Sequence, residues 1–288
     1  MSSSTNAILI GIAISDIISA FYYFKKGIHD LQITGLDKCE SAASYKIALV
    51  NWVMAAFTDC FRRSSSWLCL LLVVMRTIVV NKVLDKKFYF LSDAKFGWKL
   101  TIMTIFISSL LTIAYVFRYQ IEDVGDIQCG GTYVDLFWIV EIGDYSKLGK
   151  IARHLHLFLT GIFSKVIPSF LFPVFAIILT SELRRTSRLR GGVSVGSEKT
   201  TKLVIYMTIM TIVIEFPIGI CKILRGLLHD NTAITVSTLN IESIFDMIYV
   251  PLTATHFFLC FAMSSQYRNT VKRTFEFSDK NVKVTTLN

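Results

Sequence analysis

The chain has 288 residues, of which 53% are hydrophobic and 18% charged, and its mean hydropathy is +0.54. Soluble domains are about 45–50% apolar and about 25% charged, so the composition argues against a soluble enzyme and excludes a disordered or collagenous chain. The formal net charge is +9, which in a membrane protein usually reflects basic cytosolic loops rather than nucleic-acid binding.

The hydrophobic residues fall into long stretches, each close to the roughly 20 residues that a helix needs to cross a bilayer. These stretches are apolar around the whole helix rather than along one stripe, which is typical of membrane spans. In chain order, the predicted spans are residues 6–24, 49–80, 98–117, 155–181, 203–228 and 234–263. The sequence therefore predicts an all-α polytopic transmembrane helix bundle over residues 1–275, followed by a cytosolic tail at 276–288.

The charges of the loops predict which side of the membrane each loop faces. Lys and Arg dominate the charged residues of the loops 81–99 and 182–202 and of the start of the tail. In residues 119–154, by contrast, Asp and Glu outnumber Lys and Arg. Basic loops stay in the cytosol, so the acidic loop is predicted to be extracellular. With six spans and a cytosolic tail, the N-terminus is also predicted to be cytosolic.

Several ionisable residues lie inside the predicted spans. Such a residue costs at least about 2.5–3.5 kcal/mol at bilayer depth and is a functional candidate by default. The candidates are Asp16 in the first span, Asp59, Arg62, Arg63 and Arg76 in the second, Glu215 in the fifth, and Glu242 and Asp246 in the sixth. They do not repeat as in a voltage sensor, and no hydrolase, metalloprotease or P-loop motif is present. We therefore do not expect an enzyme.

Asp59, Arg62, Arg63 and Ser66 are spaced at i, i+3, i+4 and i+7, which places them on one face of a helix. This face is expected to line the bundle interior, where Asp59 partly neutralises the arginines. One interpretation is the floor of a ligand pocket, in which the arginines suit a carboxylate and the acids suit a basic or amidated peptide. The other is a self-satisfied ion-pair network that fixes helix packing. In either case, the acids on the facing helices are Glu215, Glu242 and Asp246.

Motifs on successive spans together resemble a known family. The order is Asn6-Ala-Ile-Leu9-Ile-Gly-Ile-Ala13-Ile-Ser-Asp16, Arg62-Arg63-Ser-Ser-Ser-Trp67-Leu, Met75-Arg76-Thr77, Glu215-Phe-Pro217-Ile-Gly219, and His256-Phe-Phe-Leu-Cys260 running on to Arg268. Over residues 6 to about 275, the chain resembles the nematode serpentine receptors of class W (Srw). These belong to the rhodopsin-like receptor superfamily and are similar to FMRFamide-type peptide receptors.

The resemblance implies a seven-helix receptor at the plasma membrane. Residues 6–24 match the second helix of the family, so helices 2–7 are expected here and the first helix is expected to be missing. The implied function is a G-protein-coupled receptor for an extracellular neuropeptide or chemosensory cue. The alternative is a small-solute transporter or channel lined by the intramembrane charges. No cofactor is expected apart from a sodium ion near Asp16.

The resemblance also assigns an activation switch. Asp16 resembles the sodium-binding Asp of the superfamily, with Ser65 as its partner; the alternative is a neutral, hydrogen-bonded carboxyl in the core. His256 stands at the family's Asn-Pro-x-x-Tyr motif, where it either pairs with Asp16 or packs between helices. Pro217 is expected to kink the moving helix. Glu215 replaces an aromatic toggle, and a salt bridge to Arg62 or Arg63 is the other interpretation.

Two further expectations follow from the resemblance. Arg76 corresponds to the Arg that faces the G protein, although Met75 replaces the preceding acid; a residue that snorkels to the interface is the alternative. The expected G-protein-facing set is Arg76, Arg184, Arg185, Lys199 and Arg268. Cys39 and Cys129, on the two outer loops, are the expected disulfide, and residues 264–275 are the expected interfacial helix.

Overall fold

The computed structural model describes residues 4–33, 44–81, 90–129, 132–141, 147–189, 205–206, 208–209, 211–228 and 231–263. Its elements are α1 (Ser4–Ile33), α2 (Tyr45–Asn81), α3 (Ala94–Val116), β1 (Tyr119–Cys129), β2 (Thr132–Glu141), α4 (Lys147–Phe158), the π-helical η3 (Leu159–Val166), α5 (Ile167–Leu189), the π-helical η4 (Thr211–Glu215), α7 (Phe216–Leu227) and α8 (Thr232–Met263).

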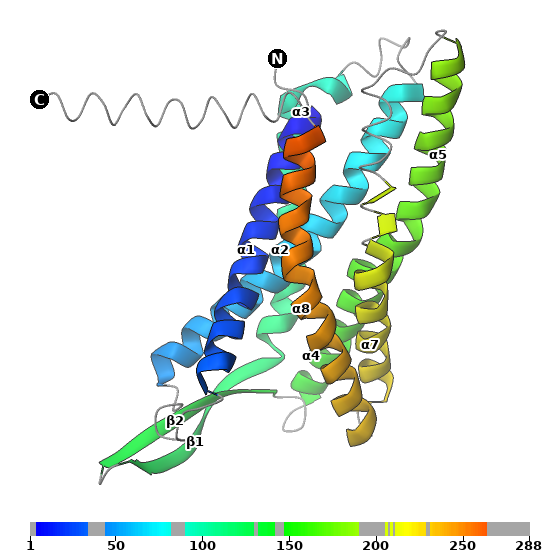
Figure 1. Ribbon diagram of the computed structural model, residues 1–288. Helices are drawn as coiled ribbons and strands as arrows, with labels where there is room; N and C mark the ends of the chain where they lie inside the picture. The colour runs from blue at the N-terminus through cyan, green and yellow to red at the C-terminus, as the bar shows by residue number, and fades with distance from the viewer. Residues whose placement is uncertain are drawn as a thin grey trace, which may run out of the picture.

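The helices form an elongated bundle in which α1 runs from the N-terminal end to the end that carries β1 and β2, and α2 runs back (Figure 1). Three described helical stretches are long and apolar enough to cross a membrane, namely Ser4–Ile28, Ala94–Val116 and Lys147–Arg185. These observations agree with the transmembrane bundle that the hydropathy of the sequence predicts.

The side chains of α3 separate into a face toward the bundle and a face toward the lipid. Its buried face consists of Gly97, Thr101, Thr104, Ser108 and Thr112, whereas large apolar side chains such as those of Ile102 and Phe106 are exposed. Small residues at this helical spacing let neighbouring backbones approach closely in a membrane. At Gly97, an added Cβ would lie 2.5 Å from the carbonyl oxygen of Ser4, so α1 packs directly on α3.

The antiparallel hairpin of β1 and β2 was not predicted. Its register runs from Tyr119 opposite Glu141 to Cys129 opposite Thr132, with a bulge where Gly125 takes a positive φ of 110°. The hairpin occupies the predicted extracellular loop 119–154 and projects beyond the helices (Figure 1). Hydropathy identifies helices in lipid but carries little information about strand pairing in a loop outside the membrane.

The bundle interior is apolar in one half and charged in the other. A cluster that includes Ile8, Leu68, Val73, Phe172 and Leu179 is buried where α1, α2 and α5 meet in the half near the N-terminus of α1. Toward the hairpin, buried charged residues take the place of apolar ones. The candidate site lies in this second half.

Candidate functional site

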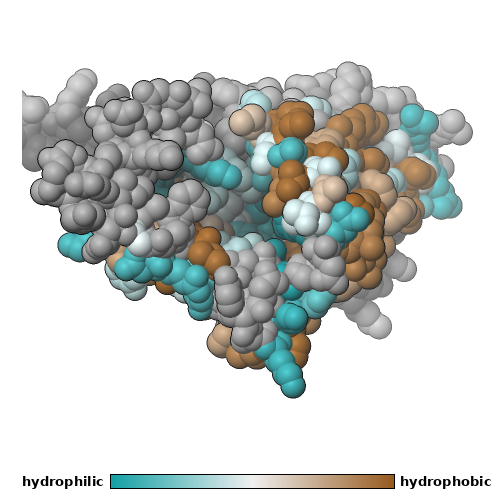
Figure 2. Space-filling model, turned by 90° about the horizontal axis from the view of Figure 1, so that it is seen from below, coloured by the Kyte–Doolittle hydropathy of each residue, from teal (hydrophilic) through white to brown (hydrophobic). Residues whose placement is uncertain are grey.

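A polar cavity of about 230 Å³ lies in the hairpin half of the bundle. Its walls come from α1, α2, the α3–β1 junction, α4, η3, α7 and α8. Viewed from the hairpin end, hydrophilic side chains gather in a central hollow, and hydrophobic ones cover the flank on the right (Figure 2). The cavity therefore opens a charged interior toward the predicted extracellular side.

Arg62 connects three helices at this cavity. Its Nε lies 3.3 Å from Oε1 of Glu215, its Nη1 lies 2.5 Å from Oδ1 of Asp246, and Nη1 also donates a 2.7 Å hydrogen bond to the hydroxyl of Tyr23. The guanidinium carbon lies 4.2 Å from the ring centroid of Tyr249. Of the two arginines that the sequence left open as the partner of Glu215, the structure places Arg62 against it.

Arg63 is directed to a different side of α2 and is almost fully buried. Its Nη2 lies 2.5 Å from Oδ2 of Asp59 one helical turn earlier. Its Nη1 donates to the carbonyl of Ser108 at 2.9 Å, and its Nε donates to Oγ of Ser164 at 2.8 Å. Arg63 thus ties α2 to α3 and to η3, and Asp59 neutralises it within the same helix.

The sequence reasoning did not identify Lys165, a central member of the cluster. Lys165 is 2% exposed and forms an ion pair with Oε2 of Glu215, whereas Arg62 contacts Oε1 of the same carboxylate. It lies inside the predicted span 155–181, so the cost of placing a charged residue at bilayer depth marks it as a functional candidate in the same way as the others.

Close packing of η3 on α7 positions this lysine. A Cβ on Gly219 would lie 2.8 Å from Cβ of Lys165, and a Cβ on Gly161 would lie 3.0 Å from the carbonyl oxygen of Gly219. Two glycines in contact therefore allow the π-helical turn to pack against α7. That approach places Lys165 beside Glu215, the last residue of η4.

A second ion-pair group joins α7 to α8. Nζ of Lys222 lies 3.5 Å and Nη1 of Arg225 lies 3.4 Å from the same oxygen, Oε2, of Glu242. Lys222 and Arg225 were also missed, although both lie inside the predicted span 203–228. Glu242 is therefore already paired with two cationic side chains.

The cavity also contains a histidine and an arginine from the hairpin side. Nη1 of Arg118 lies 2.9 Å from Nδ1 of His156, and Nε2 of His156 lies 3.5 Å from Oδ1 of Asp59. The guanidinium of Arg118 lies 4.8 Å above the ring of Tyr119. Arg118 precedes β1 directly, so the unpredicted hairpin carries one wall of the cavity.

The residues of the expected activation switch are only partly described. Oγ of Ser65 donates a 2.5 Å hydrogen bond to Oδ1 of Asp16, and both residues are buried. Within the described part of the chain, no group of three or more His, Cys, Asp or Glu residues could hold a metal ion. Pro217 lies in the first turn of α7, directly after η4. The side chain of His256 in α8 lies outside the described residues, so its pairing with Asp16 stays a prediction.

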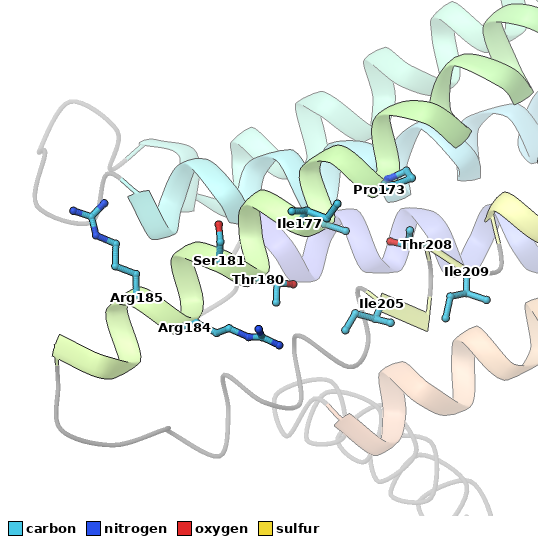
Figure 3. A pocket seen from close by; sticks show the side chains of 10 residues that line it. Pro173, Ile177, Thr180, Ser181, Arg184, Arg185, Ile205, Thr208 and Ile209 are labelled. Carbon is cyan, nitrogen blue, oxygen red and sulfur yellow. The ribbon is translucent and has the colours of Figure 1, made fainter.

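The predicted cytosolic end holds the expected G-protein-facing residues that are described. Arg76 is half-buried near the end of α2, and Arg184 and Arg185 are exposed near the end of α5. The latter two border a groove between α5 and a segment that contributes Ile205, Thr208 and Ile209 (Figure 3). The remaining predicted features lie outside the described residues or side chains: Lys199, Arg268, the Cys39–Cys129 disulfide, the interfacial helix 264–275 and the tail 276–288.

The sequence model of a family described as serpentine type 7TM GPCR chemoreceptor Srw matches residues 1–278, which is nearly the whole chain. A search of curated proteins finds no match to this chain.

Proposed function

The chain belongs to the Srw family of serpentine seven-transmembrane G-protein-coupled chemoreceptors, and from this premise we propose that it binds an extracellular ligand in the charged cavity and activates a heterotrimeric G protein at the opposite end of the bundle. Membership makes it a multi-pass receptor of the plasma membrane and not a member of an enzyme family. The ligand is a small chemical cue or the end of a peptide, and the cavity in the hairpin half is its site.

The observation that carries this proposal is the ion-pair network around Arg62. It joins α2 to η4 through Glu215 and to α8 through Asp246, and Lys165 joins η3 to the same Glu215. A ligand that binds Arg62 or its partners changes the links between these helices. Ion pairs between helices are elements that can be rearranged between two discrete packings, and a ligand shifts the balance by its difference in affinity for the two.

The helices of the network also reach the predicted cytosolic side. Arg76 is fourteen residues beyond Arg62 on α2, or roughly 21 Å at 1.5 Å per residue. Between them, Leu68, Val73 and Met75 pack tightly against α5. Because close-packed cores transmit displacement rather than absorb it, a change at Arg62 is expected to alter the arrangement around Arg76. In this proposal, Arg184 and Arg185 contact the G protein beside it.

A transporter or channel is the alternative from a different class. A conduction path needs polar or hydrated surface through the whole membrane. Among the described residues, most of the buried charged side chains lie in the hairpin half, and the other half contains a buried apolar cluster between α1, α2 and α5. This division favours a receptor.

The test is a ligand screen in cells that express the chain with its membrane targeting verified. We expect members of a peptide and small-molecule library to evoke a second-messenger response that requires a G protein and produces no ionic current. Arg62→Gln is expected to abolish the response, and Lys150→Gln, an exposed lysine on the hairpin side that does not line the cavity, is the control. Substrate flux in proteoliposomes without any G protein would contradict the proposal.

A further inference from the structure

We infer that the ligand of the charged cavity carries an oxyanion, a carboxylate or phosphate, which binds on the outer wall formed by Arg118, Lys222 and Arg225. This inference rests on the proposed function, because it assigns a ligand class to the same cavity. It decides between two options that the sequence left open, a ligand with a carboxylate and a basic or amidated peptide.

Positive charge outweighs negative charge among the described residues that line the cavity. Seven of them are basic and three are acidic. The basic set is Lys26, Arg62, Arg63, Arg118, Lys165, Lys222 and Arg225, and the acidic set is Asp59, Glu242 and Asp246. Glu215 does not line the cavity but pairs with two of the cations, and counting it still leaves three more positive charges than negative ones.

The carboxylates at the cavity already have cationic partners. Asp59 pairs with Arg63, Asp246 with Arg62, and Glu215 with Arg62 and Lys165. A basic ligand would have to displace an internal cation and leave it buried without its partner, which costs several kcal/mol. An anionic ligand requires no such exchange, because it adds negative charge where positive charge is in excess.

The excess of positive charge is not spread evenly over the cavity. At the floor, Arg62, Arg63 and Lys165 are balanced by three carboxylates, of Asp59, Glu215 and Asp246. Toward the hairpin, by contrast, Lys222 and Arg225 share the single carboxylate of Glu242. Arg118, at the start of the hairpin, belongs to the same wall but already contacts His156, so it is not counted here. Among the described residues, the two cations that share one carboxylate therefore lie toward the side from which an extracellular ligand enters.

Unpaired hydrogen-bond donors point to the same conclusion. Within the described part of the chain, Nε of Arg225 and Nη2 of Arg62 are buried atoms that make no hydrogen bond, and these two residues, 7% and 6% exposed, line the cavity. Buried guanidinium donors are normally satisfied, and an oxyanion is the acceptor whose geometry fits them best. Oε1 of Glu242 is an unpaired acceptor nearby, but its carboxylate faces two cations, so it does not create a cation site.

The size of the cavity limits what enters it. Its volume is about 230 Å³, which lies below the roughly 300–1,000 Å³ of sites that enclose a whole drug-sized ligand. The cavity holds a small organic acid or phosphate, or the free C-terminal carboxylate of a peptide whose remainder lies outside. These sources share one chemistry, and matched probes separate them.

The experiment measures thermal stability of the purified full chain in nanodiscs with matched probes at equal ionic strength. One pair is succinate and succinamide. The other pair is a dipeptide with a free C-terminal carboxylate and the same dipeptide with an amidated C-terminus; inorganic phosphate is the fifth probe. We expect at least one acid to raise the melting temperature in a saturable manner and its amide to have no such effect. Response to succinate alone indicates a small acid, to the dipeptide acid a peptide end, and to phosphate a phosphorylated ligand.

Two opposite variants make the test specific to this wall. Arg225→Gln removes a charged donor and is expected to weaken acid binding about tenfold to a hundredfold. Glu242→Gln releases Lys222 and Arg225 and is expected to strengthen it about tenfold. Lys150→Gln is the matched control and is expected to leave the affinity unchanged. The general stabilisation that phosphate and other salts give any protein would persist in Arg225→Gln, so its loss there identifies binding at this wall.

The outcomes distinguish the inference from the proposed function because stability is measured without a G protein. Equal shifts from acid and amide, no saturable shift from any acid, or weaker acid binding in folded Glu242→Gln protein would overturn the inference. Stabilisation by an acid without second-messenger activity would leave the anion site in place and contradict the receptor mechanism. A screen whose active ligands are amidated cations, insensitive to Arg225→Gln, would keep the receptor and refute the anion site.

Discussion

Nε of Arg62 and Oε1 of Glu215 lie 3.3 Å apart and join the middle of α2 to the π-helical turn that leads into α7. Both side chains are less than a tenth exposed, and Lys165 contacts the other oxygen of the same carboxylate. A carboxylate held between two cations from different helices fixes the relative position of α2, η3 and α7. Rearranging this contact is the smallest change by which a ligand could alter the bundle.

The first prediction concerns the stability that this ion pair provides. Arg62→Gln removes one partner and leaves Glu215 and Asp246 without their guanidinium, so we expect it to lower the free energy of unfolding by about 3–5 kcal/mol. In the double variant with Glu215→Gln, the loss is expected to be smaller than the sum of the two single losses. Thermal unfolding of the four proteins in detergent gives the coupling. Additive losses would show that the two residues act independently.

A second prediction concerns the contact between Ser65 and Asp16. Ser65→Ala removes the hydroxyl that donates a 2.5 Å hydrogen bond to the buried carboxyl, and we expect a loss of about 1–3 kcal/mol in thermal stability. Ser66→Ala is the matched control, because the hydroxyl of Ser66 donates only to the carbonyl of Arg62 in its own helix. A loss in the control as large as that in Ser65→Ala would contradict a specific role for this contact.

The resemblance to the receptor superfamily also predicts a sodium ion near Asp16. We expect sodium chloride, compared with choline chloride at the same concentration, to lower the affinity for an activating ligand in the wild-type chain. Asp16→Asn removes the charge that a sodium ion requires, so the difference between the two salts is expected to disappear. The measurement is ligand binding to membranes in each salt. A sodium effect that persists in Asp16→Asn would place the ion elsewhere.

Hydropathy was sufficient to predict the helical bundle, whereas the direction in the membrane that the loop charges indicate stays a prediction. Each helix in lipid must be long and apolar, which leaves a strong signal in one sequence. The hairpin and the two π-helical turns leave weaker signals. At η3, the irregular turn accompanies the contact of Gly161 with Gly219, which are 58 residues apart in the chain. A contact between distant residues is not visible in the periodicity of either segment.

The candidate site was predictable in part. The spacing of Asp59, Arg62 and Arg63 correctly places them toward the bundle interior, because side chains three or four residues apart share a helical face. Their partners could not be derived, since Arg62 and Arg63 differ by about 100° around the helix and only the packing decides which of them meets Glu215. Lys165 also lies inside a predicted span, so the same criterion would have selected it, but it was missed.

A fourth prediction concerns signalling through Arg76. Arg76→Gln is expected to reduce G-protein activation at least about tenfold if the charge contacts the G protein, in line with the loss of a charged hydrogen bond. Ligand-induced stabilisation of the purified chain is expected to be unchanged, because Arg76 does not line the charged cavity. Nucleotide exchange on a reconstituted G protein provides the measurement. Full activation by Arg76→Gln would favour the interpretation of a residue that snorkels to the interface.

The last prediction tests whether the close approach of η3 and α7 positions the network. A Cβ on Gly219 would meet Cβ of Lys165 at 2.8 Å and Cγ2 of Val166 at 3.0 Å, so Gly219→Ala has to push the two segments apart. Overpacking of this kind typically costs about 1–3 kcal/mol, and the ion pair of Lys165 with Glu215 is expected to weaken with it. Gly27→Ala is the matched control, because nothing lies within 4 Å of its Cβ position on α1; there we expect no loss, or a gain of up to about 1 kcal/mol from helix propensity. Melting temperatures of both variants, measured with and without an activating ligand, provide the comparison. Equal effects of the two substitutions would show that the glycine contact does not hold the cavity in shape.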